Sequence, residues 1–184
     1  MKRFFVVTAL IAGGALVLPF AVQAGRDDLQ LAIVEPITFA QPADCPTGAI
    51  DFGIAPLHGK GGTGSNCILS DDFPVSCPPG VTADFCERVG IRMALSLPGG
   101  TIEAANGEIF EAWTCAGGAY LPDGTCTSVW NIDQRWSGAV TAVSGRFHAL
   151  AGGVVSGGGL LVFDGPTFNF VSIDETLAIS AFED

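Results

Sequence analysis

The sequence predicts an all-β fold, a single antiparallel β-barrel of about eight strands with disulfide-closed loops. Three observations support this prediction. Short runs of alternating apolar and polar residues recur along the chain, Gly and Pro separate them, and helix signals are nearly absent. Closing such a sheet on itself removes its exposed edges, and about eight strands fit into a chain of this length.

Residues 1–24 are predicted to be a secretory signal peptide. Lys2 and Arg3 give it a positive start, 4–21 is apolar, and Val22-Gln23-Ala24 is a small-residue cleavage site. The alternative is a retained membrane anchor. Removal of the signal leaves 25–184, enough for one domain with its own core. We therefore expect a periplasmic or extracellular protein.

The segment 25–184 is strongly acidic. It holds six Lys and Arg against nineteen Asp and Glu, a net charge of −13. Such a domain is a poor partner for nucleic-acid phosphates, so no nucleic acid is expected. The carboxylates are scattered as singles and pairs, which is typical of a solvated surface.

Four segments show the alternation of half-buried strands. The first is 29–39, where Pro36 indicates an edge or a bulge. The second and third are 91–97 and 130–142, and the apolar face of the third ends at Ala142. In the fourth, 168–179, the apolar parity changes once after Phe170, which predicts a β-bulge.

Two glycine-containing segments are predicted to be turns. Asn106-Gly107 lies between the short runs 101–103 and 109–111, and Asn-Gly supplies the positive φ angles of a tight hairpin. Gly157-Gly158-Gly159 lacks the helix start and lysine of a phosphate-binding loop, so it is also predicted to be a turn. The uncharged stretch 149–163 around it is too short and glycine-rich for a membrane helix.

Residues 41–90 are rich in Cys, Pro and Gly and are expected to be mainly long loops closed by disulfides, with one or two strands inside. They contain four of the six cysteines. Six cysteines allow fifteen pairings, and the simplest hypothesis joins near neighbours: Cys45 with Cys67, Cys77 with Cys86, and Cys115 with Cys126. The alternative is zinc. Because no Cys-x-x-Cys spacing occurs and the chain has only two histidines, we expect disulfides and no metal site.

Three stretches carry a family resemblance. They are 101–110, with its Ala-Ala-Asn-Gly strand and turn, Val143-Ser144-Gly145-Arg146-Phe147 with the Ala/Gly-rich 149–153, and Leu57-His58-Gly59-Lys60. They resemble a group of secreted bacterial β-barrels related to the allene oxide cyclase and dirigent (calycin-like) barrels. The resemblance implies a barrel over roughly 56–182. Its motifs are turn and packing motifs, so it transfers no catalytic residue.

Aromatic residues are the first candidates for a ligand site. Trp113 and Tyr120 are amphipathic and suit the mouth of a concave site. Trp130 and Trp136 share the apolar face of one predicted strand, so we expect them in the core instead.

Arg146 and His148 complete the candidate ligand-binding residues. For Arg146 the alternatives are an anchor for an anionic ligand and a surface salt bridge. His148 either contributes to a site or forms a local hydrogen bond, and the same alternatives hold for the other histidine, His58. No catalytic residue is predicted.

Glu103, Glu108 and Glu111 surround the predicted hairpin. Paired carboxylates can perform acid-base chemistry, but across a tight hairpin they can equally point to water.

The expected function is that of a non-enzymatic barrel that binds a small, mostly apolar molecule without a cofactor. Two alternatives stay open: a filled barrel with a structural or surface-interaction role, and a cyclase- or isomerase-like enzyme, which only the resemblance suggests. The enzyme would need a polar cluster inside the barrel. We expect no stable membrane insertion after signal removal, because polar outward faces and loop cysteines are unusual in outer-membrane barrels. Ligand identity and oligomeric state are not readable from the sequence.

Overall fold

The computed structural model describes residues 28–45, 47–56, 60–69 and 73–181. The predicted signal peptide, 1–24, and His58 lie outside these residues. Within them the chain forms a closed eight-stranded antiparallel β-barrel with one additional short strand and one 3-10 helix. No helix in these ranges is long and apolar enough to cross a membrane. The predicted all-β barrel is confirmed.

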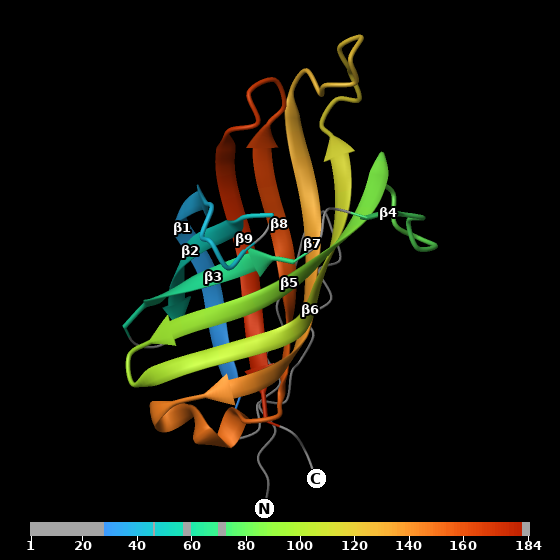
Figure 1. Cartoon of the computed structure of the whole chain (residues 1–184). Coiled ribbons are helices and arrows are strands. Elements are labelled where there is room, and N and C mark those ends of the chain that lie inside the picture. The colour runs from blue at the N-terminus through green and yellow to red at the C-terminus, as the bar shows by residue number, and fades with distance from the viewer. Residues whose placement is uncertain (1–27, 46, 57–59, 70–72, 182–184) are drawn as a thin grey trace, which may run out of the picture.

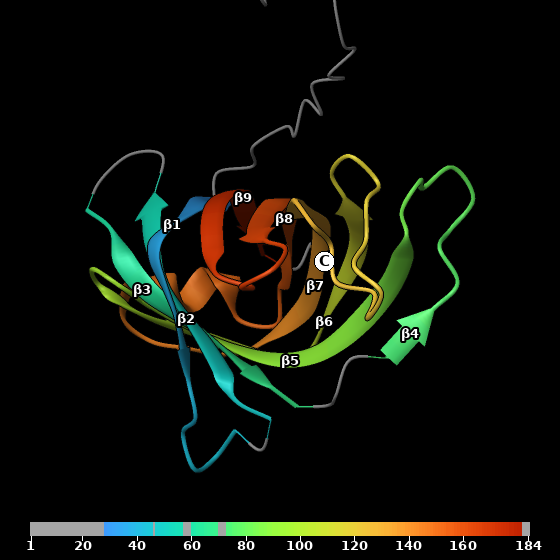
Figure 2. The same cartoon turned by 90° about the horizontal axis from the view of Figure 1, so that it is seen from above.

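The barrel closes through strands that are distant in sequence (Figures 1 and 2). The strand order is β3-β2-β1-β9-β8-β7-β6-β5, and β3 pairs with β5 to complete the ring. The short β4 pairs with the start of β5, beyond the part of β5 that β3 reaches. In chain order the elements are β1 (Leu29–Ala40), β2 (Ala49–Pro56), β3 (Gly62–Ile68), β4 (Phe73–Val75), β5 (Phe85–Leu97), β6 (Gly100–Cys115), β7 (Val129–Val143), η1 (Gly145–Leu150), β8 (Val154–Asp164) and β9 (Phe170–Ser180).

The two ends of the barrel differ (Figure 1). At the helix end, η1 inserts Phe147 and Leu150 into the main core cluster, which also holds Ile102, Val140 and Leu177. At the loop end lie the β6–β7 connection, 116–128, and the β8–β9 connection, 165–169. A second core cluster, centred on Ile132, Leu161 and Phe163, lies toward that end. The barrel interior is therefore packed in two clusters, which Ile37 and Ile173 both contact.

All three predicted disulfides are present: Cys45–Cys67, Cys77–Cys86 and Cys115–Cys126. They join β3 to the segment before β2, β5 to the β4–β5 connection, and the end of β6 to the β6–β7 connection. No cysteine is left free, so the zinc alternative has no thiolate ligands. Three disulfides are typical of proteins that fold in an oxidising compartment.

The predicted hairpin at Asn106-Gly107 is wrong. These residues lie inside β6, which pairs with β5 on one side and β7 on the other, and both registers shift there. A bulge of this kind bends a long strand around a barrel. A Cβ at Gly107 would come within 2.9 Å of the Ile91 side chain, so the glycine permits close packing instead of a turn. The β5–β6 turn is formed by Pro98-Gly99.

Two further local predictions are corrected. Gly157-Gly158-Gly159 is the middle of β8, fully paired with β7 and β9, and is not a turn. Residues 41–90 contain β2, β3, β4 and the first part of β5, more strand than the one or two expected. In both places the neighbouring strands decide the structure. Gly157-Gly158-Gly159 is held in the sheet by β7 and β9. The β3 segment has little apolar alternation of its own and is held in the sheet by β2 and β5.

The predicted bulges are confirmed. The β1–β2 register shifts between Val34 and Ile37, around Pro36, and the β8–β9 register shifts where Phe163 pairs with Phe170. Ala142 is a further correction. The β6–β7 register shifts just before it, and Ala142 is exposed instead of continuing the buried face of β7.

Candidate functional site

The barrel interior contains two adjoining chambers toward its loop end. The larger has a volume of about 160 Å³ and the smaller about 30 Å³. Their walls are mainly apolar and come from both core clusters, and the two chambers share Asn66 and Gln134 among their lining residues. Glu111 and Trp113 line only the larger chamber, whereas Trp136 and Glu175 line only the smaller one.

A row of polar residues crosses four neighbouring strands at this level. Glu111 on β6 pairs with Gln134 on β7, Gln134 with Gly159 on β8, and Gly159 with Glu175 on β9. The three side chains in this row are buried. A Cβ at Gly159 would clash with the carbonyl oxygen of Asp174, so β8 can pass this close to β9 only without a side chain. The barrel therefore has the interior polar cluster that an enzyme would require.

Neutral donors hold the two interior carboxyl groups. Gln134 Nε2 donates to Glu111 Oε1 at 2.5 Å, and Trp113 Nε1 donates to Glu111 Oε2 at 2.9 Å. Trp136 Nε1 donates to Glu175 Oε2 at 3.2 Å. No Lys, Arg or His is among the residues that line either chamber. The described residues that line the two chambers therefore include carboxyl groups but no cationic side chain.

The Glu175 carboxyl group has a strongly raised pKa. Glu175 is only 2% exposed to solvent. Burial raises the pKa of Glu175 to about 8, the hydrogen bond from Trp136 opposes this shift, and the negative charges of Glu111 and Asp133 add to it. Glu175 therefore carries a proton at neutral pH.

Two buried polar atoms at the chambers have no hydrogen-bond partner among the described residues. They are Glu175 Oε1 and Asn66 Oδ1, and both residues line the smaller chamber. Asn66 is 1% exposed, so water outside the barrel cannot reach it. Buried polar groups in folded proteins almost always have a partner, and an unpaired one costs about 1–3 kcal/mol. The smaller chamber can therefore accept a polar group that forms hydrogen bonds with these two atoms.

Aromatic rings separate the larger chamber from an open hollow of about 720 Å³ at the loop end. Trp113 and Phe168 line both spaces. Their rings are stacked with centroids 5.9 Å apart, and Phe168 stacks on Phe163 at 4.9 Å. Phe168 is half exposed and has a φ of +55°, a conformation that non-glycine residues rarely adopt. Trp113 and Phe168 thus form a partition between the open hollow and the larger chamber.

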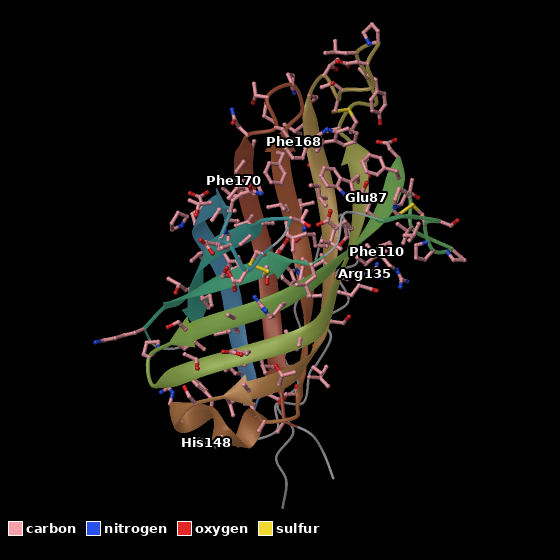
Figure 3. The ribbon with its side chains drawn as sticks, viewed as in Figure 1. Glu87, Phe110, Arg135, His148, Phe168 and Phe170 are labelled. Carbon is pink, nitrogen blue, oxygen red and sulfur yellow. A yellow bond between two sulfur atoms is a disulfide. The ribbon has the colours of Figure 1, made fainter. Side chains whose placement is uncertain are left out.

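The predicted ligand residues lie at opposite ends of the barrel. Trp113 and Tyr120 both line the open hollow. Arg146 and His148 are exposed on η1, at the other end, as Figure 3 shows for His148 and Phe168. The Arg146 guanidinium lies 5.1 Å from the centroid of the Phe147 ring. The four residues therefore do not form one site, and only the first two lie near the chambers.

Tyr120 is fixed at the rim of the hollow by Asp84. The hydrogen bond to the Asp84 carboxylate raises the pKa of Tyr120 to about 12. Asp84 Oδ2 also accepts from the Cys115 backbone N–H at 2.6 Å. The Asp84 carboxylate thereby connects the β6–β7 connection to the segment before β5.

The three predicted glutamates do not gather. Glu103 is exposed, Glu108 forms a surface ion pair with Arg88 at 3.2 Å, and only Glu111 is buried inside. As predicted, Trp130 and Trp136 are buried in the core clusters.

Sequence reasoning missed Asn66, Gln134 and Glu175. For two of them the sequence contained a signal, because a polar residue stands where the alternation expects an apolar, core-facing one. Gln134 lies between Ile132 and Trp136, and Glu175 lies between Ile173 and Leu177.

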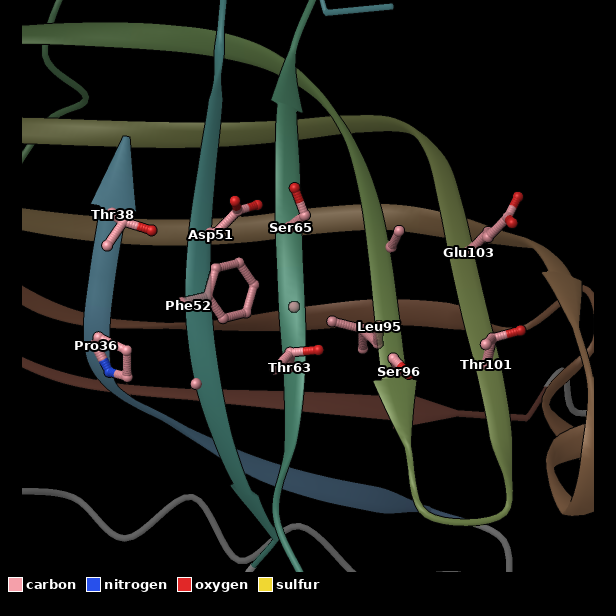
Figure 4. A pocket seen from close by; sticks show the side chains of 13 residues that line it. Pro36, Thr38, Asp51, Phe52, Thr63, Ser65, Leu95, Ser96, Thr101 and Glu103 are labelled. Carbon is pink, nitrogen blue, oxygen red and sulfur yellow. The ribbon is translucent and has the colours of Figure 1, made fainter. Parts of the chain in front are cut away.

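A second hollow lies on the outer face of the barrel, over β1, β2, β3, β5 and β6 (Figure 4). It has a volume of about 540 Å³ and is lined largely by short hydroxyl side chains such as Thr38, Ser65 and Thr101, with the carboxylates of Asp51 and Glu103. These polar side chains are at least partly exposed to solvent. It is larger than the inner chambers but has no unpaired buried group, so the interior is the better candidate site.

Comparison of the chain with protein-family models, with curated proteins and with solved structures finds no match. The described ranges contain no group of three or more His, Cys, Asp or Glu side chains placed to hold a metal ion.

Proposed function

We propose that this protein is an exported, non-enzymatic β-barrel that binds one small, mostly apolar molecule in its interior chambers. An apolar cavity of about 150 Å³ accepts benzene in another protein. The larger chamber, at about 160 Å³, therefore suits a ligand body of about six to ten non-hydrogen atoms. The three disulfides and the predicted signal peptide support export.

The observation that carries this proposal is the pair of unpartnered polar atoms, Asn66 Oδ1 and Glu175 Oε1. A barrel with a purely structural role is most stable when apolar side chains fill it, and unpaired polar groups there reduce its stability. A bound ligand that reaches both atoms offsets that cost. This argues for a binding site over the alternative of a filled barrel.

Native mass spectrometry and thermal unfolding test the proposal. Protein purified from its own host is expected to carry a co-purifying small molecule, and protein made free of ligand should gain thermal stability when ring-sized apolar compounds are added. Val89→Phe fills the larger chamber from β5 and should abolish this stabilisation. Ala94→Phe places the same ring on the outer face of β5 and should leave it intact.

The absence of both a ligand mass and any stabilisation would argue against the proposal. So would equal stabilisation of the Val89→Phe and Ala94→Phe variants, since the compounds would then bind elsewhere.

An isomerase-like activity is the second candidate, and the interior polar cluster favours it. A carboxylic acid that stays protonated at neutral pH, near a second carboxyl group, is an arrangement that enzymes use for proton transfer next to a carbonyl. Glu175 and Glu111 are such a pair. Incubation with cyclohexanone in D₂O is the test, because catalysed exchange of its α-protons should disappear in Glu111→Gln. No exchange above the buffer rate would exclude the activity for this ketone.

A further inference from the structure

The two unpartnered atoms in the smaller chamber are complementary to each other. Glu175 Oε2 accepts a hydrogen bond from Trp136 Nε1, so the proton of the neutral carboxyl group belongs on Oε1. Glu175 Oε1 is then a hydrogen-bond donor without an acceptor. Asn66 Oδ1 is an amide oxygen and can only accept. The smaller chamber thus presents one donor and one acceptor to whatever occupies it.

A hydroxyl group satisfies both atoms through one oxygen. It donates one hydrogen bond and accepts others, whereas a carbonyl oxygen only accepts and an ammonium group only donates. The chamber volume of about 30 Å³ is sufficient for a group of this size. A ligand carboxylate is disfavoured, because Glu111 is already in the polar row and no cation lines the chambers.

The two chambers can hold one molecule between them. Both are lined by Asn66 and Gln134, and they share apolar walls that include Ile109, Leu161 and Phe163. A polar group in the smaller chamber therefore lies next to an apolar body in the larger one. This division matches a molecule with a single polar end.

We propose that the ligand is a neutral alcohol with a ring-sized apolar body, whose hydroxyl group accepts from Glu175 Oε1 and donates to Asn66 Oδ1. This inference rests on the proposed binding function and specifies its ligand class. The hydroxyl occupies the smaller chamber, and the apolar body packs against Ile132, Leu161 and Phe163 in the larger one.

Four matched compounds test the assignment at neutral pH: cyclohexanol, cyclohexanone, cyclohexylamine and methylcyclohexane. They share one ring and differ in the polar group. Calorimetric titration of the full folded protein is expected to give about tenfold or more tighter binding for cyclohexanol than for methylcyclohexane, because each satisfied hydrogen bond contributes about 1 kcal/mol. Cyclohexanone should fall below cyclohexanol, since it leaves Asn66 Oδ1 unpaired. The cyclohexylammonium ion should also fall below cyclohexanol, because its charge must lose its water to enter a chamber lined mainly by apolar side chains.

Variants identify the two contacts. Asn66→Leu and Glu175→Met should lose the preference for cyclohexanol over methylcyclohexane, and retained methylcyclohexane binding shows that each variant is folded. Glu175→Gln keeps a donor at this position and should retain most of the preference.

The failure of this inference is distinguishable from the failure of the proposed function. If methylcyclohexane binds as tightly as cyclohexanol, or if the ketone or amine binds tightest, the barrel is a binding protein but the alcohol assignment is wrong. If none of the four compounds binds, both proposals are overturned. A preference for cyclohexanol that persists in Asn66→Leu and Glu175→Met would also overturn the assignment, because the hydroxyl would then lie elsewhere.

Discussion

Replacing Glu175 by glutamine is expected to stabilise the fold, and increasingly so as the pH rises. The pKa of this carboxyl group is about 8 in the folded protein, against an ordinary value of 4.5. Between these values the folded state keeps a proton that the unfolded state has lost. Stability therefore decreases with pH in this window, by about 1.4 kcal/mol per unit. The accumulated cost reaches about 3 kcal/mol at pH 7 and about 5 kcal/mol above pH 8.

Glutamine has nearly the same shape and stays neutral, and its amide oxygen can still accept from Trp136 Nε1. Glu175→Gln should therefore match the parent protein near pH 4.5 and exceed its free energy of unfolding by about 3 kcal/mol at pH 7. Urea unfolding with intact disulfides, at pH 5, 7 and 9, measures the difference.

Glu108→Gln is the matched control. Glu108 lies in an exposed ion pair with Arg88, and its replacement should change stability by less than about 1 kcal/mol. If the difference between Glu175→Gln and the parent protein is constant across the pH range, Glu175 does not titrate in this window and the reasoning fails.

Three further changes test separate parts of the structure. Cys115→Ser with Cys126→Ser removes a buried disulfide at the loop end and should lower the free energy of urea unfolding by about 2–3 kcal/mol; a loss below about 1 kcal/mol would contradict this. Gly159→Ala should cost at least about 2 kcal/mol more than Gly117→Ala, because both glycines have a positive φ but only a Cβ at Gly159 also meets the β9 backbone, and equal losses would show that β9 moves aside at little cost. Phe168→Gly suits the positive φ and opens the partition, so stopped-flow measurements should show faster entry of cyclohexanol, and an unchanged rate would place the entrance elsewhere.

The two ends of the barrel interior differ in how their side chains are packed. At the helix end, the main core cluster and the inserted Phe147 and Leu150 supply apolar burial, the principal source of stability. Toward the loop end, Glu175 Oε1 and Asn66 Oδ1 are buried without a partner among the described protein atoms.

Local sequence patterns were sufficient for the fold class. The alternation of apolar and polar residues in 91–97 and 130–142 indicates which side chains face the core. This periodicity is a property of a single strand and needs no knowledge of its neighbours. The bulges at Pro36 and after Phe170 were predictable for the same reason, because each interrupts a local parity. The disulfides followed from the short spacing of their cysteines.

Local patterns were insufficient where the pairing partner decides the structure. Asn106-Gly107 has the residues of a hairpin turn, but β5 and β7 already pair with the strand on both sides of it. Similarly, β3 has few apolar residues and becomes a strand because it closes the ring against β5. Long-range hydrogen bonds override local propensity in both places.

The candidate site depends most on tertiary structure. The sequence by itself contains the signal that Gln134 and Glu175 occupy inward positions, since each interrupts an apolar series of one parity, although sequence reasoning identified neither residue. Only the register across β6, β7, β8 and β9 placed them in one row with Glu111, and only closure of the ring brought Asn66 on β3 to the same chamber as Glu175. The physical reason is that strand periodicity fixes the direction of a side chain, whereas strand pairing fixes its neighbours.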